Sequence, residues 1–473
     1  MFSLLGMSAL ACSVFAANLS PIDTFYPTGL NSTSYITNGS LGTNGGTYHA
    51  PANQLAENSP YGIYSYCSMP HPRVQEYELP SVKEAKIVYL EYFQRHQRRT
   101  MYNLAPGGEN QPFDCSTFEG YLYGAGAKAG DDPMRVYGDI YTDPNNPFVD
   151  TLPFVNATCM FPQLTLGGLL DGFQHGKDLW AVYGEKLGLF PKEPNSKVWL
   201  RSSSSSVTQP SAGAVLRGIW PEWNGPLPLR QQANGVDTIN RGYPCSTRNT
   251  IFDAIGATEE WNEHLKVTAD LRATLGAMLG ATNGAWQNSF DHFSDNFQAR
   301  LCNGYDLPCS FTNHSDCVTT EQAEEVFRAG DWEWHFHWRG NSQATQLIQV
   351  VEGLFIGEIV GRLQAVLDGK QEYVYAHTFF HDGDIGPILG ALGIDVMRWP
   401  GMASNVAIEI WEVSAEQFHK APATTHYARV LYSGHPIKTI HGTLDWIELS
   451  KLISILQVYV PKDIISLCGI TRR

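Results

Sequence analysis

Positively charged residues are scarce in this chain of 473 residues. Only 32 lysines and arginines stand against 47 aspartates and glutamates, which gives a formal net charge of −15. A protein that binds nucleic acid needs a basic face to neutralise phosphates, and this composition leaves little for one. The charge balance therefore argues against nucleic acid as a partner and favours a soluble protein suited to acidic surroundings.

Long apolar runs are also missing beyond the N-terminus. No later run reaches the length needed to cross a membrane, and the last residues carry no lipid-anchor signal. Residues 1–17 contain no charge, have an apolar centre and end in Ala16-Ala17, small residues typical of a signal-peptidase site. A buried helix is the alternative, because the usual positive start is lacking. We expect a signal peptide over 1–17 and no membrane partner.

Cysteines are few, but their number is informative. Removal of residues 1–17 would discard Cys12 and leave eight cysteines, and an even number in an exported chain predicts disulfide bonds. Sequences of the type Asn-X-Ser/Thr begin at Asn18 and at four further positions, where we expect N-glycans: Asn31, Asn38, Asn156 and Asn313. The sequence thus predicts a secreted glycoprotein, with the cell wall or a vacuole as alternative destinations.

Composition and periodicity divide the chain into segments. Residues 18–80 are rich in Asn, Gly, Ser, Thr and Pro and predict a loop-rich arm. Strand and helix patterns alternate over 81–220 and 341–473, which predicts an α/β core with a mixed or mostly parallel sheet and helices on both faces. Residues 221–340 show only helical periodicity. We expect these residues to form an inserted helical cap.

Apolar patterns place the individual elements. Buried strands are predicted over 86–93, 196–201, 373–380, 406–413 and 426–432. Thr165 is the expected N-cap of a long helix that closes near Gly188. In the cap we expect one amphipathic helix from Thr258 to Met278, another over 290–301, and a third behind the capping-box sequence Thr319-x-x-Gln322. A further helix is expected over 344–367.

The strand predicted over 86–93 runs directly into Gln94-Arg95-His96-Gln97-Arg98-Arg99-Thr100. Ligands of open α/β sheets bind beyond the carboxyl ends of the strands. An imidazole between fixed cations is kept neutral, because like charge lowers its pKa. It can then attack an anion that guanidinium groups hold by bidentate hydrogen bonds. Phosphate is the anion that fits this description.

The motif Arg95-His96-x-x-Arg99 resembles the Arg-His-Gly-x-Arg-x-Pro sequence of the histidine acid phosphatases. His381-Asp382, which follows the strand over 373–380, resembles the His-Asp pair of the same family. The resemblance extends over about residues 85–435, and residues 381–392 are close to fungal members. It implies the phosphoglycerate-mutase-like histidine phosphatase fold, a doubly wound α/β sheet with a helical cap over its carboxyl edge.

The resemblance also implies a reaction and roles for the residues. Phosphate monoesters would be hydrolysed through a phosphohistidine at His96, with Asp382 as proton donor and later as base. Arg95, Arg99 and His381 would bind the phosphate, and no metal or cofactor would be required. Acidic pH suits a scheme that needs a neutral His96 and a protonated Asp382. The low Lys and Arg content favours a broad-specificity acid phosphatase over the alternative, a phytase.

Three positions depart from the family pattern. Gln97 stands where the family has Gly, Met101 where it has Pro, and Val207 where it has a third phosphate-clamping Arg. Loss of a clamping charge costs on the order of 10²–10³ in rate, unless Arg201 or Arg217 compensates. A non-catalytic phosphate-binding relative is therefore the alternative function.

Two other chemistries are weaker. His335-x-His337 offers two possible metal ligands on one strand face, but neighbouring Trp and Phe residues favour a packed aromatic segment, and no carboxylate spacing completes a zinc site. The serine run at 202–206 lies in no Gly-x-Ser-x-Gly sequence, which disfavours serine hydrolysis.

Overall fold

The computed structural model describes residues 66–82, 85–108, 121–123, 134–136, 143, 145–147, 159–413 and 426–470. The predicted signal peptide, most of the N-terminal arm and the sequons at Asn18, Asn31, Asn38 and Asn156 lie outside these residues. The described part of the arm, 66–80, contains no helix or strand. Within the described residues, no helix is both long and apolar enough to span a membrane.

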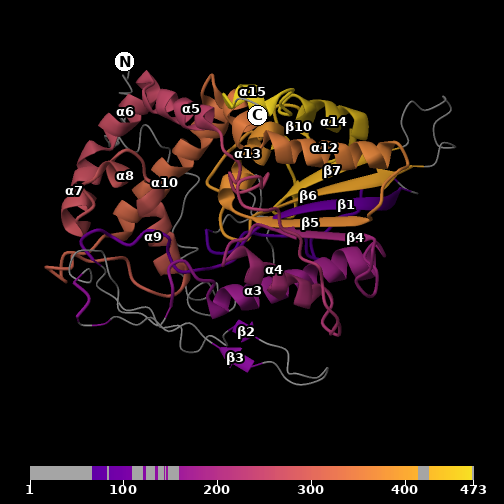
Figure 1. Ribbon diagram of the computed structural model, residues 1–473, viewed down its shortest axis with the longest axis horizontal. Helices are drawn as coiled ribbons and strands as arrows, with labels where there is room; N and C mark the ends of the chain where they lie inside the picture. The colour runs from indigo at the N-terminus through magenta and orange to yellow at the C-terminus, as the bar shows by residue number, and fades with distance from the viewer. Residues whose placement is uncertain are drawn as a thin grey trace, which may run out of the picture.

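Within the described residues, a mixed sheet of seven strands forms the centre of the molecule (Figure 1). Its strands are β1 (Lys86–Arg95), β4 (Val198–Ser202), β5 (Tyr375–Phe380), β6 (Asn405–Glu412), β7 (His426–Tyr432), β8 (His435–Pro436) and β11 (Ile447–Glu448). The spatial order is β11-β7-β6-β1-β5-β4, and β8 pairs with β7. Strands β1, β5 and β4 are parallel, whereas β6 and β7 run antiparallel to their neighbours. The predicted α/β class with a mixed sheet is confirmed.

The register of the parallel strands decides which residues meet at the carboxyl edge. Arg95, the last residue of β1, lies opposite Phe380, the last residue of β5. The backbone N–H of His96 donates to the carbonyl of Phe380 at 3.1 Å. His96 and His381 therefore leave neighbouring strands at the same level.

Helices cover both faces of this sheet (Figure 1). One face carries α3 (Leu166–Leu179), the π-helical segment η3 (Trp180–Lys186) and α4 (Thr208–Ile219). The other carries α11 (Ala344–Val351), α12 (Gly353–Leu367), α13 (Asp382–Leu392) and α14 (Leu449–Gln457). Side chains alternate along β1, so Leu90 and Tyr92 pack towards the first group and Tyr89 and Phe93 towards the second. Both faces of β1 are thus buried, as its continuous apolar run predicts.

Helices α3 and α4 approach each other at two glycines. A Cβ on Gly176 would lie 2.0 Å from the carbonyl oxygen of Val215, and one on Gly218 would lie 2.2 Å from that of Phe173. Only glycine permits this backbone contact. Helix α3 begins where the sequence predicts, because the Thr165 hydroxyl accepts a hydrogen bond from the N–H of Gly168 at 3.3 Å.

Of the residues 221–340 predicted to form a cap, 221–245 contain no helix, and most of the helices that follow lie to one side of the sheet (Figure 1). These helices are α5 (Ser246–Gly256), α6 (Glu259–Val267), α7 (Ala269–Leu279), α8 (Gly284–Gln287), α9 (Asp291–Cys302) and α10 (Thr320–His335), followed by the π-helical η4 (Phe336–Gly340). Several surround an apolar cluster of their own that includes Leu275, Phe293 and Phe297. The capping box of Thr319 and Gln322 is confirmed in both halves. The exact boundaries of core and cap stay a prediction.

Two predicted helices are interrupted. The helix expected from Thr258 to Met278 is two helices, α6 and α7, because the backbone turns at Thr268 (φ −99°, ψ 9°), whose hydroxyl donates to the carbonyl of His264 at 2.8 Å. The helix expected over 344–367 breaks at Glu352 (φ −127°, ψ −4°) into α11 and α12. Apolar periodicity continues across both breaks, so the pattern did not reveal them.

Small elements and disulfides complete the described structure. Short strands are β2 (Tyr121–Tyr123), β3 (Met134–Val136), β9 (Lys438–Thr439) and β10 (Gly442–Thr443), and the last helix is α15 (Ile464–Leu467). Disulfides join Cys67 to Cys302, Cys245 to Cys468 and Cys309 to Cys317, and Cys159 is also disulfide-bonded. The prediction of disulfides is confirmed, and they are typical of proteins that fold outside the reducing cytosol.

Candidate active site

The two sequence motifs meet at the carboxyl edge of the sheet. The ring centroids of His96 and His381 lie 5.2 Å apart, with an angle of 69° between the planes. Arg95, Arg99 and Asp382 surround the pair. All five residues that the sequence singled out for catalysis or phosphate binding are therefore gathered in one place.

One ring nitrogen of His96 carries an unprotonated lone pair. Its Nδ1 lies 2.8 Å from the carbonyl oxygen of Gln97, and because a carbonyl can only accept, Nδ1 carries the proton. The lone pair is then on Nε2, which lies 3.5 Å from Nε of Arg99. Burial, followed by the charges of Arg95 and Arg99, holds the pKa of His96 well below its usual value. The imidazole is therefore neutral, as the sequence predicts.

His381 stands where β5 gives way to α13. Its backbone N–H donates to the Asp384 carboxylate at 3.0 Å, which fixes the turn. On the other side, its Nε2 lies 3.4 Å from the hydroxyl of Ser203, the residue that follows β4. Burial lowers the pKa of His381 to about 4, against the opposing effect of the Asp382 carboxylate. His381 thus offers a neutral hydrogen-bonding group beside His96.

Asp382, the first residue of α13, is bound on several sides. Arg95 lies 2.8 Å from its Oδ2, the indole N–H of Trp399 donates to the same oxygen at 2.8 Å, and the N–H of Gly383 donates to Oδ1 at 2.8 Å. Burial raises the pKa of Asp382, but Arg95 and Trp399 outweigh it, so the net pKa lies below the usual value. The carboxyl group is therefore ionised at neutral pH.

Arg99 has a carboxylate partner as well. Its NH2 donates to Oδ1 of Asp295 at 2.7 Å, and its NH1 donates to the carbonyl of Thr100 at 2.9 Å. The guanidinium carbon lies 4.2 Å from the centroid of the Tyr102 ring. Tyr102 is 42% exposed and its ring lies 6.4 Å from that of His381. Tyr102, together with Asp382, whose side chain is 21% exposed, brings the buried histidines close to solvent.

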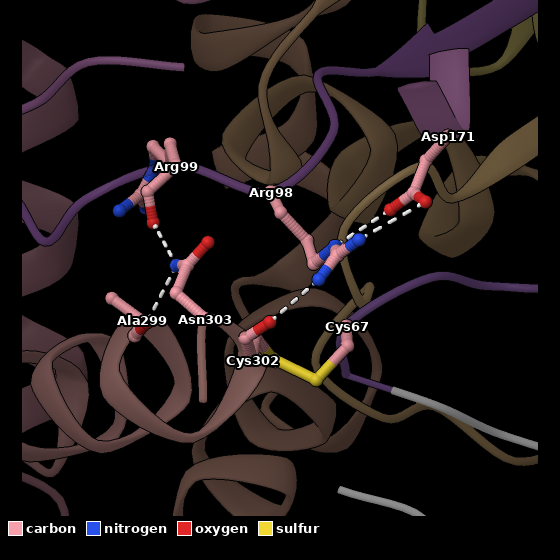
Figure 2. Close-up of a disulfide and its surroundings, with 7 residues drawn as sticks. All are labelled: Cys67, Arg98, Arg99, Asp171, Ala299, Cys302 and Asn303. Carbon is pink, nitrogen blue, oxygen red and sulfur yellow. Dashed lines mark hydrogen bonds and ion pairs between the residues drawn. A yellow bond between two sulfur atoms is a disulfide. The ribbon is translucent and has the colours of Figure 1, made fainter. Parts of the chain in front are cut away.

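Arg98 faces away from the site, although it lies next to Arg99. Its guanidinium donates twice to the carboxylate of Asp171 in α3, at 2.6 and 3.1 Å, and to the carbonyl of Cys302 at 2.9 Å (Figure 2). Arg98 therefore anchors the loop and takes no part in the anion site.

The side chains of Gln97 and Met101, the two residues near His96 that depart from the family pattern, lie away from the site. The buried Gln97 accepts a hydrogen bond from the Ser211 hydroxyl of α4, and its amide carbon would lie 3.2 Å from a Cβ on Gly172 of α3. Its side chain thus occupies the space between two helices. Met101 is buried against Cys159 and Ala299. These contacts account for a Gln and a Met at the two positions without crowding the histidines.

Neither Arg201 nor Arg217 supplies the phosphate-clamping charge that is missing at Val207. Val207 is buried at the start of α4. Arg201 donates to Asp237 at 2.6 Å and to Glu358 at 2.8 Å, so its guanidinium is engaged elsewhere. Arg217 is exposed and donates to the carbonyl of Trp223. The suggestion that Arg201 or Arg217 replaces the third clamp is therefore wrong.

Several residues of the site were missed by sequence reasoning. Asp295, Trp399 and Ser203 each contact one of the predicted residues, but they come from different segments and show no local motif. Only Ser203, two residues beyond the strand predicted over 196–201, carried a signal that could have indicated the edge of the sheet.

A further cation lies near the first turn of α13. Asn240 and Arg241 both have left-handed backbones, with φ of 56° and 52°, a conformation that is strained for such residues. The N–H of Asn240 donates to the Asp384 carboxylate, which also holds His381. This turn brings the exposed Arg241 guanidinium within 3.8 Å of the position of a Cβ on Gly383. The sequence carried no signal for this placement.

His335 and His337 lie on α10 and η4, not on a strand, which corrects that part of the metal-site hypothesis. His337 is partly buried beside Trp261, with 4.9 Å between ring centroids, and Trp332 stacks on Phe336 at 4.8 Å. The packed aromatic segment is confirmed. Among the described residues, no three or more His, Cys, Asp or Glu side chains are grouped in a way that could hold a metal ion.

Known proteins show similarities to this chain in sequence and in fold. No protein-family model matches the chain. A 2-phosphoxylose phosphatase 1 of Homo sapiens is 21% identical over 394 residues, which cover 79% of this chain and 76% of the relative. Counting factor 60 of Dictyostelium discoideum is 23% identical over 376 residues, covering 75% of this chain and 82% of the relative.

Among solved structures, a Hafnia alvei phytase in complex with tartrate superimposes with a TM-score of 0.51 at 12% identity, covering 82% of this chain and 99% of the phytase. A phytase of Klebsiella sp. ASR1 gives a TM-score of 0.50 at 13% identity, covering 80% of this chain and 97% of the phytase. The fold likeness and the sequence relatives together support the histidine acid phosphatase family, which the two motifs predicted.

Proposed function

We propose that this protein hydrolyses phosphate monoesters through a phosphohistidine at His96, with Asp382 as proton donor. The observation that carries the proposal is the 5.2 Å approach of the His96 and His381 rings from two remote segments, with Arg95 and Arg99 beside them. The sequence relatives that are phosphatases by name add support.

In the first step, Nε2 of His96 attacks the phosphorus atom. The bond from phosphorus to the leaving oxygen breaks, and Asp382 gives its proton to that oxygen. Arg95, Arg99 and His381 stabilise the charge on the non-bridging oxygens. An ionised Asp382 cannot donate this proton, but a bound phosphate places negative charge beside the carboxyl group and raises its pKa. Substrate binding and acidic pH together supply the protonated form.

In the second step, water attacks the phosphorus atom of the phosphohistidine. The bond from phosphorus to Nε2 breaks, and the Asp382 carboxylate takes the proton from water. Phosphate leaves, while His96 is again neutral and Asp382 is again protonated. The cycle needs His96 neutral at acidic pH, and burial between two guanidiniums supports that state.

The natural setting that we propose is outside the cytosol. The disulfides Cys67–Cys302 and Cys245–Cys468 support folding in an oxidising compartment. Export by the N-terminal segment and N-glycans at Asn31, Asn38, Asn156 and Asn313 complete this proposal. Asn313 is exposed, as a glycan acceptor must be.

A broad-specificity acid phosphatase is favoured over a phytase, because Lys and Arg are scarce. Phytate carries several phosphates and needs cations beyond the two that face His96. Arg241, near Gly383, is one candidate. If phytate were the substrate, Arg241→Ala would raise its KM more than that of a simple aryl phosphate.

A non-catalytic phosphate-binding protein is the second candidate. It is favoured by Val207 at the position of the missing clamp and by the engagement of Arg201 with Asp237 and Glu358. Such a protein would bind phosphate at His96 without turnover.

The deciding experiment compares the wild type with His96→Ala on a panel of phosphate esters that includes an aryl phosphate and phytate, at mildly acidic pH, both with and without a chelator. We expect turnover by the wild type and a loss of about 10⁴-fold in the variant. Phosphate binding without turnover by the wild type would favour the second candidate, and activity abolished by the chelator would point to a metal hydrolase.

A further inference from the structure

Helix α9 of the cap holds Arg99 at two levels. At the side chain, Oδ1 of Asp295 accepts from NH2 of Arg99 at 2.7 Å. At the backbone, the Asn303 amide donates to the carbonyl of Arg99 at 3.0 Å and to that of Ala299 at 2.7 Å (Figure 2). The guanidinium and the backbone of Arg99 are thus both tied to the same helix and the turn that follows it.

The carboxylate of Asp295 is itself fixed. Its second oxygen, Oδ2, accepts from the backbone N–H of Tyr102 at 2.7 Å and from that of Asn103 at 3.2 Å. Its side chain is only 7% exposed. The helix end is joined by the Cys67–Cys302 disulfide to the segment that precedes β1 (Figure 2). Asp295 therefore offers Arg99 a rigid, charged partner.

We propose that Asp295 is a positioning residue, which aims the Arg99 guanidinium at the phosphate bound by His96. This inference rests on the proposed function. Nε of Arg99 lies 3.5 Å from Nε2 of His96, the atom that would bond to phosphorus. Because Asp295 holds the opposite end of the same planar group, it determines where the remaining N–H groups point. A donor fixed before the reaction begins lowers the barrier more than one that must first be ordered.

If Asp295 acted only through its charge, its replacement would change phosphate binding in the opposite direction. A carboxylate close to an anion site repels phosphate, so its replacement by a neutral amide would tighten phosphate binding and leave turnover unchanged or raised. Positioning predicts weaker phosphate binding and slower turnover, since Arg99 loses its fixed orientation. The two roles are therefore distinguished by the direction of the change.

The test is Asp295→Asn, measured with an aryl phosphate as substrate and with inorganic phosphate as ligand in calorimetry. We expect kcat/KM to fall by about 10–100-fold, with most of the loss in kcat, and phosphate binding to weaken. Asp291→Asn is the matched control, because Asp291 lies on the same helix, is exposed and bonds to the side chain of its neighbour His292. It should leave both quantities unchanged.

A double-mutant cycle tests whether Asp295 acts through Arg99. If it does, Asp295→Asn has no further effect on kcat/KM in an Arg99→Ala background. Asp295→Glu should restore part of the activity, and it replaces the Asn variant if that variant fails to fold. Additive losses, or tighter phosphate binding by Asp295→Asn, would overturn the inference. Absence of turnover in the wild type would instead count against the proposed function, and the calorimetric comparison would still test Asp295.

Discussion

Two groups of buried histidines lie near strands β1 and β5, and they differ in what surrounds them. The first is the edge pair, His96 and His381, each one residue beyond the end of its strand. The second is the enclosed group, His71, His175 and His377, which lies towards α3, with His377 inside β5. His71 stacks on His175 at 4.0 Å between centroids. Both groups are buried, but different side chains surround them.

The enclosed histidines bond to neighbouring side chains, although Nδ1 of His71 and Nε2 of His377 have no hydrogen-bond partner among the described residues. Nε2 of His175 lies 2.8 Å from the hydroxyl of Tyr92, and Nδ1 of His377 lies 2.6 Å from that of Tyr375. Burial lowers the pKa of both histidines well below the usual value, as it does for His96. A lowered pKa is therefore no sign of catalysis by itself.

The edge pair differs because two guanidiniums and a carboxylate face it and because Tyr102 and Asp382 connect it to solvent. Position relative to the strand end decides the role. A histidine inside the strand packs under a helix, whereas one residue past the end of the strand the side chain meets the loops that bind an anion.

The largest difference between the groups should appear in turnover. Asp382→Asn removes the proton donor of the edge pair, and we expect kcat to fall by about 10²–10⁴-fold, least for aryl phosphates whose leaving groups need little protonation. His377→Asn keeps an acceptor for the Tyr375 hydroxyl and should leave kcat within about threefold, under about 0.7 kcal/mol of barrier. Steady-state kinetics on alkyl and aryl phosphates measures both. Equal losses of kcat in Asp382→Asn and His377→Asn would show that the edge pair and the enclosed group do not differ in function.

The next difference concerns stability in acid. His377 is buried with a pKa well below its usual value, so below about pH 6.5 the unfolded chain binds a proton that the folded chain does not. Stability therefore falls as the pH decreases through this window, by up to about 1.4 kcal/mol per pH unit for this group. His377→Asn should flatten the dependence, as measured by urea unfolding between about pH 7 and 5. Replacing the exposed His314 by Gln is the control, and an unchanged slope in His377→Asn would contradict the assignment.

The smallest effect is expected at Gln97. Its side chain lies between α3 and α4, where it bonds to Ser211, so Gln97→Gly should change kcat/KM by less than about threefold. The same variant should lose about 1–3 kcal/mol of stability, because it removes a buried side chain and leaves the Ser211 hydroxyl without this acceptor. Thermal unfolding and steady-state kinetics measure the two effects. A large rise in activity would show that Gln97 obstructs the phosphate after all.

Local sequence patterns were enough to predict the strands and helix starts around the site. The apolar run over 86–93 predicts β1, and the run over 373–380 predicts β5, which places His96 and His381 just beyond the ends of two strands. The hydroxyl residues Thr165 and Thr319 marked helix starts, because capping uses residues only three positions apart. Such short-range rules need no knowledge of the fold.

Contacts between distant segments were beyond the sequence. The Asp295 carboxylate reaches Arg99 from the cap, and the Trp399 indole reaches Asp382 from a loop, without any spacing that marks them. Asp237 and Glu358 likewise bind the Arg201 guanidinium, which keeps it from clamping phosphate. Gly353, directly after the break at Glu352, packs closely on Pro461, a tertiary contact that periodicity does not encode.

The central claim is a covalent bond between phosphorus and His96. The most direct measurement mixes the protein with an aryl phosphate at acidic pH, quenches the reaction in alkali, in which phosphohistidine is stable, and locates the phosphoryl group by mass spectrometry of the digest. We predict one phosphorylated residue, His96, and none in His96→Ala. Turnover with the phosphoryl group on another residue, or with no phosphorylated residue at all, would contradict it.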